Sequence, residues 1–319
     1  MADNVWYNNF MEMLHKKHSK KNELTDALMD LLCLEREAVY RRLRGDVIFT
    51  ANEIAKVAIA WNISLDEVMR LSSKFTFHMQ HTNYLTPSEE DMKFMKKRVS
   101  VLKDLKHSSN SEYMVVCNNL SRSLSAGFAN LYKFNIFKWA YQYGNETENI
   151  KYSEITLAEE LIKEVETYYR RMKYVTNTSY ILDNRIFDYT IHEVKFFHSI
   201  FLITDEEKEL IKNDLYSLLD YMLEVAKAGS FPETKNKVQI YISMFNVNTN
   251  YSYFYNGKIE ACRIHTFNMH DNITYNSEMI EKFKVWMQKT KKTSYQISEA
   301  NEKSRIEFFT QQRQLIDSL

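Results

Sequence analysis

Glycine and proline are scarce in this chain, with only 5 Gly and 2 Pro among 319 residues. Because these residue types supply most tight turns and helix breakers, their scarcity favours long helices joined by short polar segments. Hydrophobic residues make up 45% of the chain, which excludes a largely disordered protein. We therefore expect a folded protein of the mainly α class, and its length indicates two domains.

Long apolar runs and clustered cysteines are also absent. No stretch approaches the roughly 18 apolar residues that a membrane-spanning helix needs, and the first residues lack the basic and apolar regions of a signal peptide. We therefore predict a cytoplasmic protein that does not contact membranes. Cys33, Cys117 and Cys262 are far apart and lack metal-ligand spacing, so we expect reduced, mostly buried thiols and neither a disulfide nor a metal site.

The familiar catalytic motifs are missing as well. The chain has no phosphate-binding P-loop, no dinucleotide-binding glycine fingerprint, no GxSxG and no HExxH. We therefore expect no enzyme activity, no catalytic residues and no cofactor. His15 and His18 are one helical turn apart, but no third ligand is near them in the sequence, and we interpret them as solvated side chains.

An excess of one charge sign is also absent, because 42 Lys and Arg residues balance 42 Asp and Glu residues. Bulk charge therefore gives no argument for binding nucleic acid, and such an argument must rest on where the charges lie.

What the sequence does contain is a run of short amphipathic segments in residues 1–75. Apolar residues recur at helical spacing from Trp6 to Leu14 and again from Leu24 to Leu32. A third helix is predicted over Arg36–Arg44, ended by Gly45 in a left-handed conformation. Two capping boxes then open a fourth and a fifth helix, formed by Thr50 with Glu53 and by Ser64 with Glu67.

The order of these elements resembles the lambda-repressor/Cro type of helix-turn-helix regulator, over the N-terminal domain only. The resemblance rests on the helix pair Leu24–Cys33 and Arg36–Arg44, on Gly45, and on the capped segments Thr50–Trp61 and Asn62–Val68. The chain departs from the family at Cys33, where the inter-helix turn usually has Gly, and at Met29, where Ala is usual. The resemblance implies that Arg36–Arg44 is the recognition helix, which enters the major groove.

The residue types on this helix suit that role. Guanidinium, hydroxyl and carboxylate groups can read base edges and hold phosphates, and flanking cations supply salt-dependent affinity. The predicted DNA-binding residues are Arg36, Glu37, Tyr40, Arg41 and Arg44, with Thr25, Lys20 and Lys21 near the DNA backbone.

We therefore predict a bacterial transcription regulator that binds double-stranded DNA sequence-specifically and acts as a homodimer, because a single helix-turn-helix reads only a half-site. The alternative is a helical scaffold that binds a protein, peptide or ligand without specific DNA readout, in which the basic face is simply solvated.

Beyond the first domain we expect a linker over residues 76–86 and a mostly helical dimerisation and sensing domain over 87–319. The alternation in residues 72–85 fits a short strand or an extended linker. Helices are predicted over 87–107, 156–173, 188–202, 204–228, 277–290 and 296–316, three of them opened by the pairs Thr86–Glu89, Thr156–Glu159 and Thr204–Glu207.

Residues 238–267 contain runs of β-branched and aromatic residues typical of strands, and Asn256-Gly257 is a strong hairpin signal. We expect a small three-stranded antiparallel meander there. The dense apolar residues from Met114 to Tyr143 could line a ligand pocket or a dimer seam, but plain helical core is favoured. The effector, a small molecule or a peptide, and its contact residues stay unknown.

Overall fold

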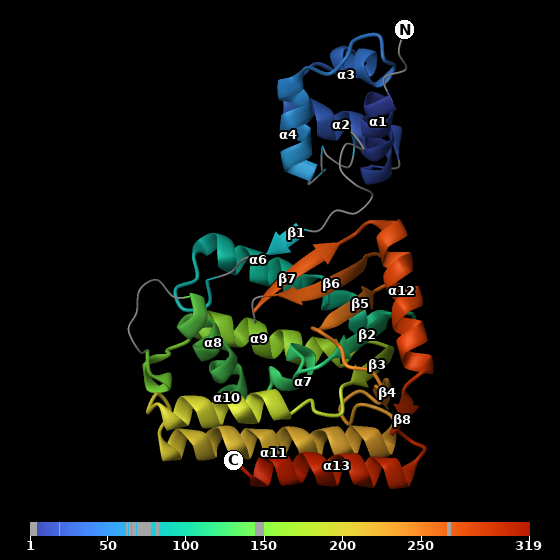
Figure 1. Cartoon of the computed structure of the whole chain (residues 1–319). Coiled ribbons are helices and arrows are strands. Elements are labelled where there is room, and N and C mark those ends of the chain that lie inside the picture. Colours follow the sequence, from blue (N-terminus) through green and yellow to red (C-terminus); the bar gives the residue numbers. More distant parts are fainter. Residues whose placement is uncertain are drawn as a thin grey trace. The chain divides into compact units, whose positions relative to one another are not determined.

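A computed structural model of the chain describes residues 5–18, 20–61, 63, 65, 68, 78–80, 83–143, 150–266 and 269–319. The chain divides into two compact units, residues 1–76 and residues 77–319 (Figure 1). None of the helices in the described residues is long and apolar enough to cross a membrane.

The N-terminal unit contains the helices that the apolar spacing predicts. They are α1 (Val5–Lys17), α2 (Lys21–Leu32), α3 (Arg36–Leu43) and α4 (Ala51–Trp61). Phe10, Leu14, Leu24, Leu28 and Val57 are fully buried in one cluster, each at the predicted inner position of its helix. The predicted fifth helix, with the Ser64–Glu67 capping box, lies largely outside the described residues.

Local signals set the ends of these helices. The backbone N–H of Thr50 donates to Glu53 at 2.8 Å and the N–H of Glu53 donates back to the Thr50 hydroxyl at 3.3 Å, which confirms this capping box. Gly45 follows α3 with a φ of 83°, the left-handed conformation predicted for it.

The C-terminal unit is built on one large mixed sheet, and this overturns the predicted mainly α class with a small antiparallel meander. Within the described residues, eight strands form this sheet in the order β1-β7-β6-β5-β2-β3-β4-β8. Their bounds are His78–Gln80 (β1), Glu112–Cys117 (β2), Asn177–Leu182 (β3), Lys237–Ile242 (β4), Tyr251–Tyr255 (β5), Glu260–Thr266 (β6), His270–Thr274 (β7) and Tyr295–Gln296 (β8).

The sheet has a parallel half and an antiparallel half. Strands β2, β3 and β4 run parallel to one another, whereas β5, β6, β7 and β1 continue antiparallel from the other side of β2. The segment predicted as the first strand of the meander is β4, which pairs with β3 and β8. Only β5 and β6 form the predicted hairpin, with Gly257 at a φ of 90° in its turn.

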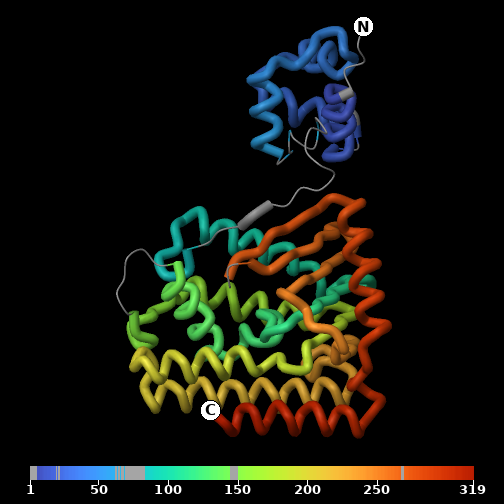
Figure 2. The backbone as a smooth tube through the Cα atoms, in the orientation of Figure 1, coloured from blue at the N-terminus to red at the C-terminus, as the bar shows by residue number. Residues whose placement is uncertain are grey.

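Helices connect and cover the strands (Figures 1 and 2). They are α6 (Glu89–Ser100), α7 (Arg122–Ser125), α8 (Ala129–Tyr143), α9 (Glu159–Met172), α10 (Asp188–Ser199), α11 (Asp205–Ala228), α12 (Ser277–Lys292) and α13 (Glu302–Asp317), with 3-10 turns η1 (Lys103–His107) and η2 (Tyr152–Glu154). On one face of the sheet, Val115 and Leu182 pack with residues from α8 to α11 and from α13 in the main core. On the other face, Met114 and Val116 pack with Ile280 and Met287 of α12.

The helix starts of this unit agree with one of the three predicted capping boxes. Thr204 and Glu207 form a capping box at the start of α11, which ends at Gly229 with a φ of 64°, as predicted. The other two boxes were wrong, because α6 is capped by Ser88 with Asp91, and α9 begins after Ala158 without a side-chain cap. Helix α13 begins at Glu302 rather than 296, since residues 295–296 form β8.

The missed strands β2 and β3 have a common cause. Five of the six residues in each strand are buried, so neither shows the alternation of a half-exposed strand. Strand β2 is mostly an apolar run, which periodicity does not separate from a buried helix. Strand β3 begins with the polar residues Asn177, Thr178 and Ser179, so its sequence lacks even an apolar signal, although Thr178 and Ser179 are buried. Within the predicted linker, residues 78–80 form β1, which pairs with β7.

Candidate functional site

Helix α3 and its flanks hold five of the predicted DNA-binding residues, and packing divides the helix into two faces. Val39 is fully buried in the core of the N-terminal unit and Leu43 packs against that core. Arg36, Glu37, Arg41 and Arg44 are exposed, and Tyr40 is half-buried. The arrangement therefore leaves one polar, mostly cationic face of α3 open to solvent.

Arg42 does not belong to that face. Its guanidinium forms two hydrogen bonds to the Glu53 carboxylate, at 2.8 and 3.1 Å, and a third to the carbonyl of Ala38. Burial alone would raise the pKa of Glu53, but the bonds from Arg42 and from the Thr50 backbone outweigh it and lower this pKa below its usual value. The pair joins α3 to α4 and is structural.

The exposed arginines differ in how they are paired. Arg36 forms an ion pair with Asp26, and Arg44 contacts both Glu37 at 3.3 Å and Asp46 at 3.0 Å. Among the residues that the structure describes, no carboxylate pairs with Arg41. Arg41 is therefore the cation of α3 whose guanidinium is open to a ligand.

The residues predicted near the DNA backbone are placed less uniformly. Lys20 is exposed at the start of α2 and pairs with Glu23 at 2.9 Å. Lys21 is the first residue of α2. Thr25 is fully buried in α2, so its hydroxyl does not lie on the surface of this unit.

The turn between α2 and α3 tolerates its unusual residue. Cys33 adopts a φ of 53° and a ψ of 48°, the left-handed conformation for which the family pattern has Gly, and its backbone N–H donates to the carbonyl of Met29. An L-residue in this conformation is strained by about 1–2 kcal/mol. The backbone of a helix-turn-helix is thus formed here without the glycine.

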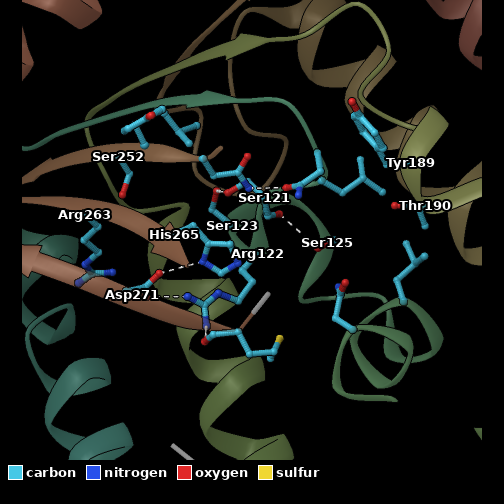
Figure 3. Close-up of a pocket in the computed structure, with 18 of the residues that line it drawn as sticks. Ser121, Arg122, Ser123, Ser125, Tyr189, Thr190, Ser252, Arg263, His265 and Asp271 are labelled. Atoms are coloured by element: carbon cyan, nitrogen blue, oxygen red, sulfur yellow. Dashed lines mark hydrogen bonds and ion pairs between the residues drawn. The ribbon is translucent and has the colours of Figure 1, made fainter. Parts of the chain in front are cut away.

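A second candidate site lies in the C-terminal unit, in a pocket at the carboxyl end of β2 (Figure 3). The segment after β2, including α7, contributes Ser121, Arg122, Ser123 and Ser125 to its wall. Strands β5, β6 and β7 contribute Ser252, Arg263, His265 and Asp271, and α10 contributes Tyr189 and Thr190. Ligands of open α/β sheets bind at this kind of position, outside the carboxyl ends of the strands.

Asp271 is the centre of a buried ion cluster beside this pocket. Its carboxylate accepts hydrogen bonds from Arg122 at 2.6 Å and Arg98 at 2.9 Å, and lies 3.0 Å from a ring nitrogen of His265. Burial alone would raise the pKa of Asp271, but the two guanidinium groups outweigh it and hold this pKa well below its usual value. One carboxylate thus holds two guanidinium groups in place.

No sequence motif indicates this pocket. Its lining comes from segments between Arg98 and Asp271 that only the tertiary fold brings together. The one local signal is the polar run Asn118-Asn119-Leu120-Ser121-Arg122-Ser123, which interrupts the apolar stretch from Met114 to Tyr143. Most of that stretch is core, as favoured, but the interruption lines the pocket.

The potential metal ligands and the cysteines of the chain do not form a further site among the described residues. Among the described residues, no group of three or more His, Cys, Asp or Glu side chains is arranged to hold a metal ion. All three cysteines are free; Cys117 and Cys262 are buried, and Cys33 is exposed. Burial raises the pKa of the Cys262 thiol to about 12, which keeps it protonated.

Comparison with known proteins bears on the N-terminal region. No curated protein and no solved structure matches the chain. A family model described as the BetR domain matches residues 1–93, which include the whole N-terminal unit, β1 and the start of α6. This family is of the helix-turn-helix DNA-binding type, in agreement with the arrangement of α2 and α3, so the N-terminal region is similar to a DNA-binding domain of that type.

Proposed function

We propose that the protein is a cytoplasmic bacterial transcription regulator whose N-terminal unit binds double-stranded DNA sequence-specifically, in the manner of lambda-repressor/Cro domains. Helix α3 enters the major groove, with Arg41 as its main base-reading side chain. The single observation that carries the proposal is the exposed face of α3, in a helix-turn-helix whose region matches a DNA-binding family.

The charges around α3 favour this role. The carboxylates that pair with Arg36 and Arg44 are exposed; they are Asp26, Glu37 and Asp46. Exposed ion pairs contribute roughly 0–1 kcal/mol each, so these arginines can exchange their partners for DNA phosphates at little cost. Arg41 needs no exchange and can form the two parallel hydrogen bonds that a guanidinium makes with guanine.

Two copies of the domain complete the proposal. A helix-turn-helix contacts about one half-site, and two-fold related recognition helices about 34 Å apart meet successive major grooves on one side of the duplex. We therefore propose that the regulator binds as a homodimer to a palindromic operator. Thr25 is left out of the interface because it is buried.

The test begins with selection of bound duplexes from a random pool by the full-length protein, followed by affinity measurements at fixed salt. We expect Arg41→Ala to weaken binding to the selected sequence by about 1–3 kcal/mol, which is about 5- to 150-fold, and to relax the preference at one base position. Lys56→Ala removes an equal charge from an exposed position on α4 and serves as the matched control.

Two results would contradict the proposal. One is a selected pool with no sequence preference, which would favour the scaffold without specific DNA readout. The other is an Arg41→Ala variant that binds and discriminates as the Lys56→Ala variant does, which would remove α3 from the interface.

A further inference from the structure

The pocket of the C-terminal unit combines several polar side chains on a sheet face that elsewhere carries apolar core. Strand register defines the row: Val115 pairs with Ser252, Ser252 with Arg263, and Arg263 with Ile273. Val115 belongs to the main core, so Ser252 and Arg263 lie on the same helix-covered face. His265 and Asp271, also paired across β6 and β7, lie on this face two residues further along.

Arg263 is a charged residue of this row without a counter-ion among the described residues. Among the described residues no carboxylate pairs with it, and its buried Nε has no hydrogen-bond partner. Arg263 as a whole is partly exposed, but an N–H group buried without a hydrogen-bond partner costs free energy, which a bound anion would recover. Arg263 lines the pocket rather than the packed core, which gives an anion access to it (Figure 3).

The charged side chains that line the pocket also favour an anionic ligand. Four basic side chains, Arg98, Arg122, Lys138 and Arg263, face two carboxylates, Glu193 and Asp271, among the described lining residues. Lys138 is neutralised by Glu193 at 2.6 Å. Arg98 and Arg122 share Asp271. Without counting His265, the pocket therefore has a formal excess of two positive charges.

Hydrogen-bond donors and acceptors surround this excess charge. The hydroxyls of Ser121 and Ser123 lie 3.1 Å apart at the end of β2, and Ser252 presents another hydroxyl next to Arg263. The cavity volume is about 70 Å³, and since one water needs roughly 10–15 Å³ by the same measure, several water-sized groups fit. The space suits a small, polar and doubly charged ligand.

We propose that this pocket binds a small phosphorylated molecule, with its phosphate held by Arg263 and by the serine hydroxyls after β2. A phosphate monoester carries about 1.5 to 2 negative charges near pH 7, which matches the excess of two positive charges. The planar guanidinium of Arg263 suits two parallel hydrogen bonds to phosphate oxygens. This inference is independent of DNA binding, and it gives the C-terminal unit a ligand class.

The experiment is calorimetric titration of the full-length protein in chloride buffer at constant ionic strength, with inorganic phosphate, glycerol phosphate and acetate as probes. We expect saturable binding of at least one phosphate probe and weaker or no binding of acetate. Stronger binding of glycerol phosphate than of inorganic phosphate would identify a phosphate monoester as the ligand, and the reverse order would identify free phosphate.

Variants test the residue that carries the proposal. Arg263→Gln should weaken phosphate binding by at least about tenfold, because it removes charge-assisted hydrogen bonds. Arg263→Lys, which keeps the charge but not the planar fork, should weaken it less. Arg170→Gln changes an exposed arginine on α9 and should leave binding within about twofold of wild type.

Thermal melting without ligand separates a binding role from a structural one. Because no described residue supplies a counter-ion to Arg263, Arg263→Gln should melt no lower than the wild type in chloride buffer. The proposal is overturned if neither phosphate probe binds, if acetate binds more tightly than both, or if Arg263→Gln binds phosphate as the wild type does. A clear loss of melting temperature without ligand would assign Arg263 to stability instead.

Discussion

Charged side chains are arranged differently in the two units of this chain. In the N-terminal unit, Arg36 and Arg44 form ion pairs that are open to water. In the C-terminal unit, Arg98 and Arg122 converge on the buried carboxylate of Asp271. Exposed pairs contribute little and exchange readily, whereas a buried group that loses its counter-ion destabilises the fold by several kcal/mol. The first arrangement suits a surface that binds a polyanion, and the second suits a fixed, pre-organised pocket.

The two units also differ in how far apart in the sequence their core residues lie. The N-terminal helices pack as one small cluster whose members are close in sequence, within residues 7–68. The main core of the C-terminal unit runs from Tyr84 to Ile316. Local helical packing in the first case, and long-range strand pairing in the second, make the smaller unit the simpler one to predict from sequence.

The largest effect that would sharpen this comparison is expected from Asp271→Asn. The change keeps the shape of the side chain but leaves Arg98 and Arg122 without their carboxylate, which should lower the free energy of unfolding by about 3 kcal/mol. Hydrogen exchange in the full-length protein should speed up in peptides of β6, β7 and α6. Asp205→Asn, at an exposed carboxylate of the same unit, is the matched control and should change exchange little.

The pKa of Asp271 adds a pH dependence of defined sign. Because this pKa lies well below the usual value of about 3.9, the carboxylate stabilises the fold above pH 4, and the stabilisation is lost as the pH falls through the lowered pKa. The wild type should therefore lose stability in this acid range more steeply than Asp271→Asn. Equal acid profiles of the two proteins would contradict the buried cluster.

A smaller effect is expected in the N-terminal unit from Glu53→Gln. Loss of the carboxylate weakens two bonds from Arg42 and the cap at Thr50, which should destabilise this unit by about 1–2 kcal/mol. The pKa of Glu53 is lowered, so its contribution is present above about pH 4.5 and is lost as the pH falls through the lowered pKa.

Hydrogen exchange of peptides from α3 and α4 measures this change, with Glu12→Gln, an exposed glutamate of α1, as the control. Comparable acceleration in the Glu12→Gln variant would show that the Arg42–Glu53 pair has no special role. Exchange that rises equally in peptides of residues 77–319 would break the contrast between the two units.

The smallest effect, and one of opposite sign, is expected from Cys33→Gly. Glycine relieves the strain of the left-handed conformation, which should raise the free energy of unfolding by about 1–2 kcal/mol. The greater conformational freedom of glycine in the unfolded chain should lower it by about 0.5–1 kcal/mol. The net stabilisation should be about 0–1.5 kcal/mol, seen as slower hydrogen exchange in peptides of α2 and α3. Cys33→Ser removes the thiol but keeps the strain, and an equal gain in that variant would assign the effect to the thiol.

Local features of this protein were determined by the sequence alone. The inner faces of the helices around Phe10, Leu28 and Val39, the capping boxes at Thr50 and Thr204, and the turn at Gly257 all follow from residues within a few positions of one another. The capping boxes and the turn are formed inside one helix or one turn, and the inner faces are marked by the local spacing of apolar residues. Each of these features can therefore be predicted without knowing which element packs against it.

Tertiary structure decided the rest. Fully buried β2 and β3 carry no alternation to mark them as strands, and only their parallel pairing, from Glu112 with Asn177 onward, defines the sheet. Arg42 faces inward because Glu53 lies across from it on α4, and Thr25 is buried by packing that its own helix does not reveal. The pocket around Arg263 exists because the chain brings residues 98 to 271 to one end of β2, and the energies that hold them there come from contacts distant in sequence.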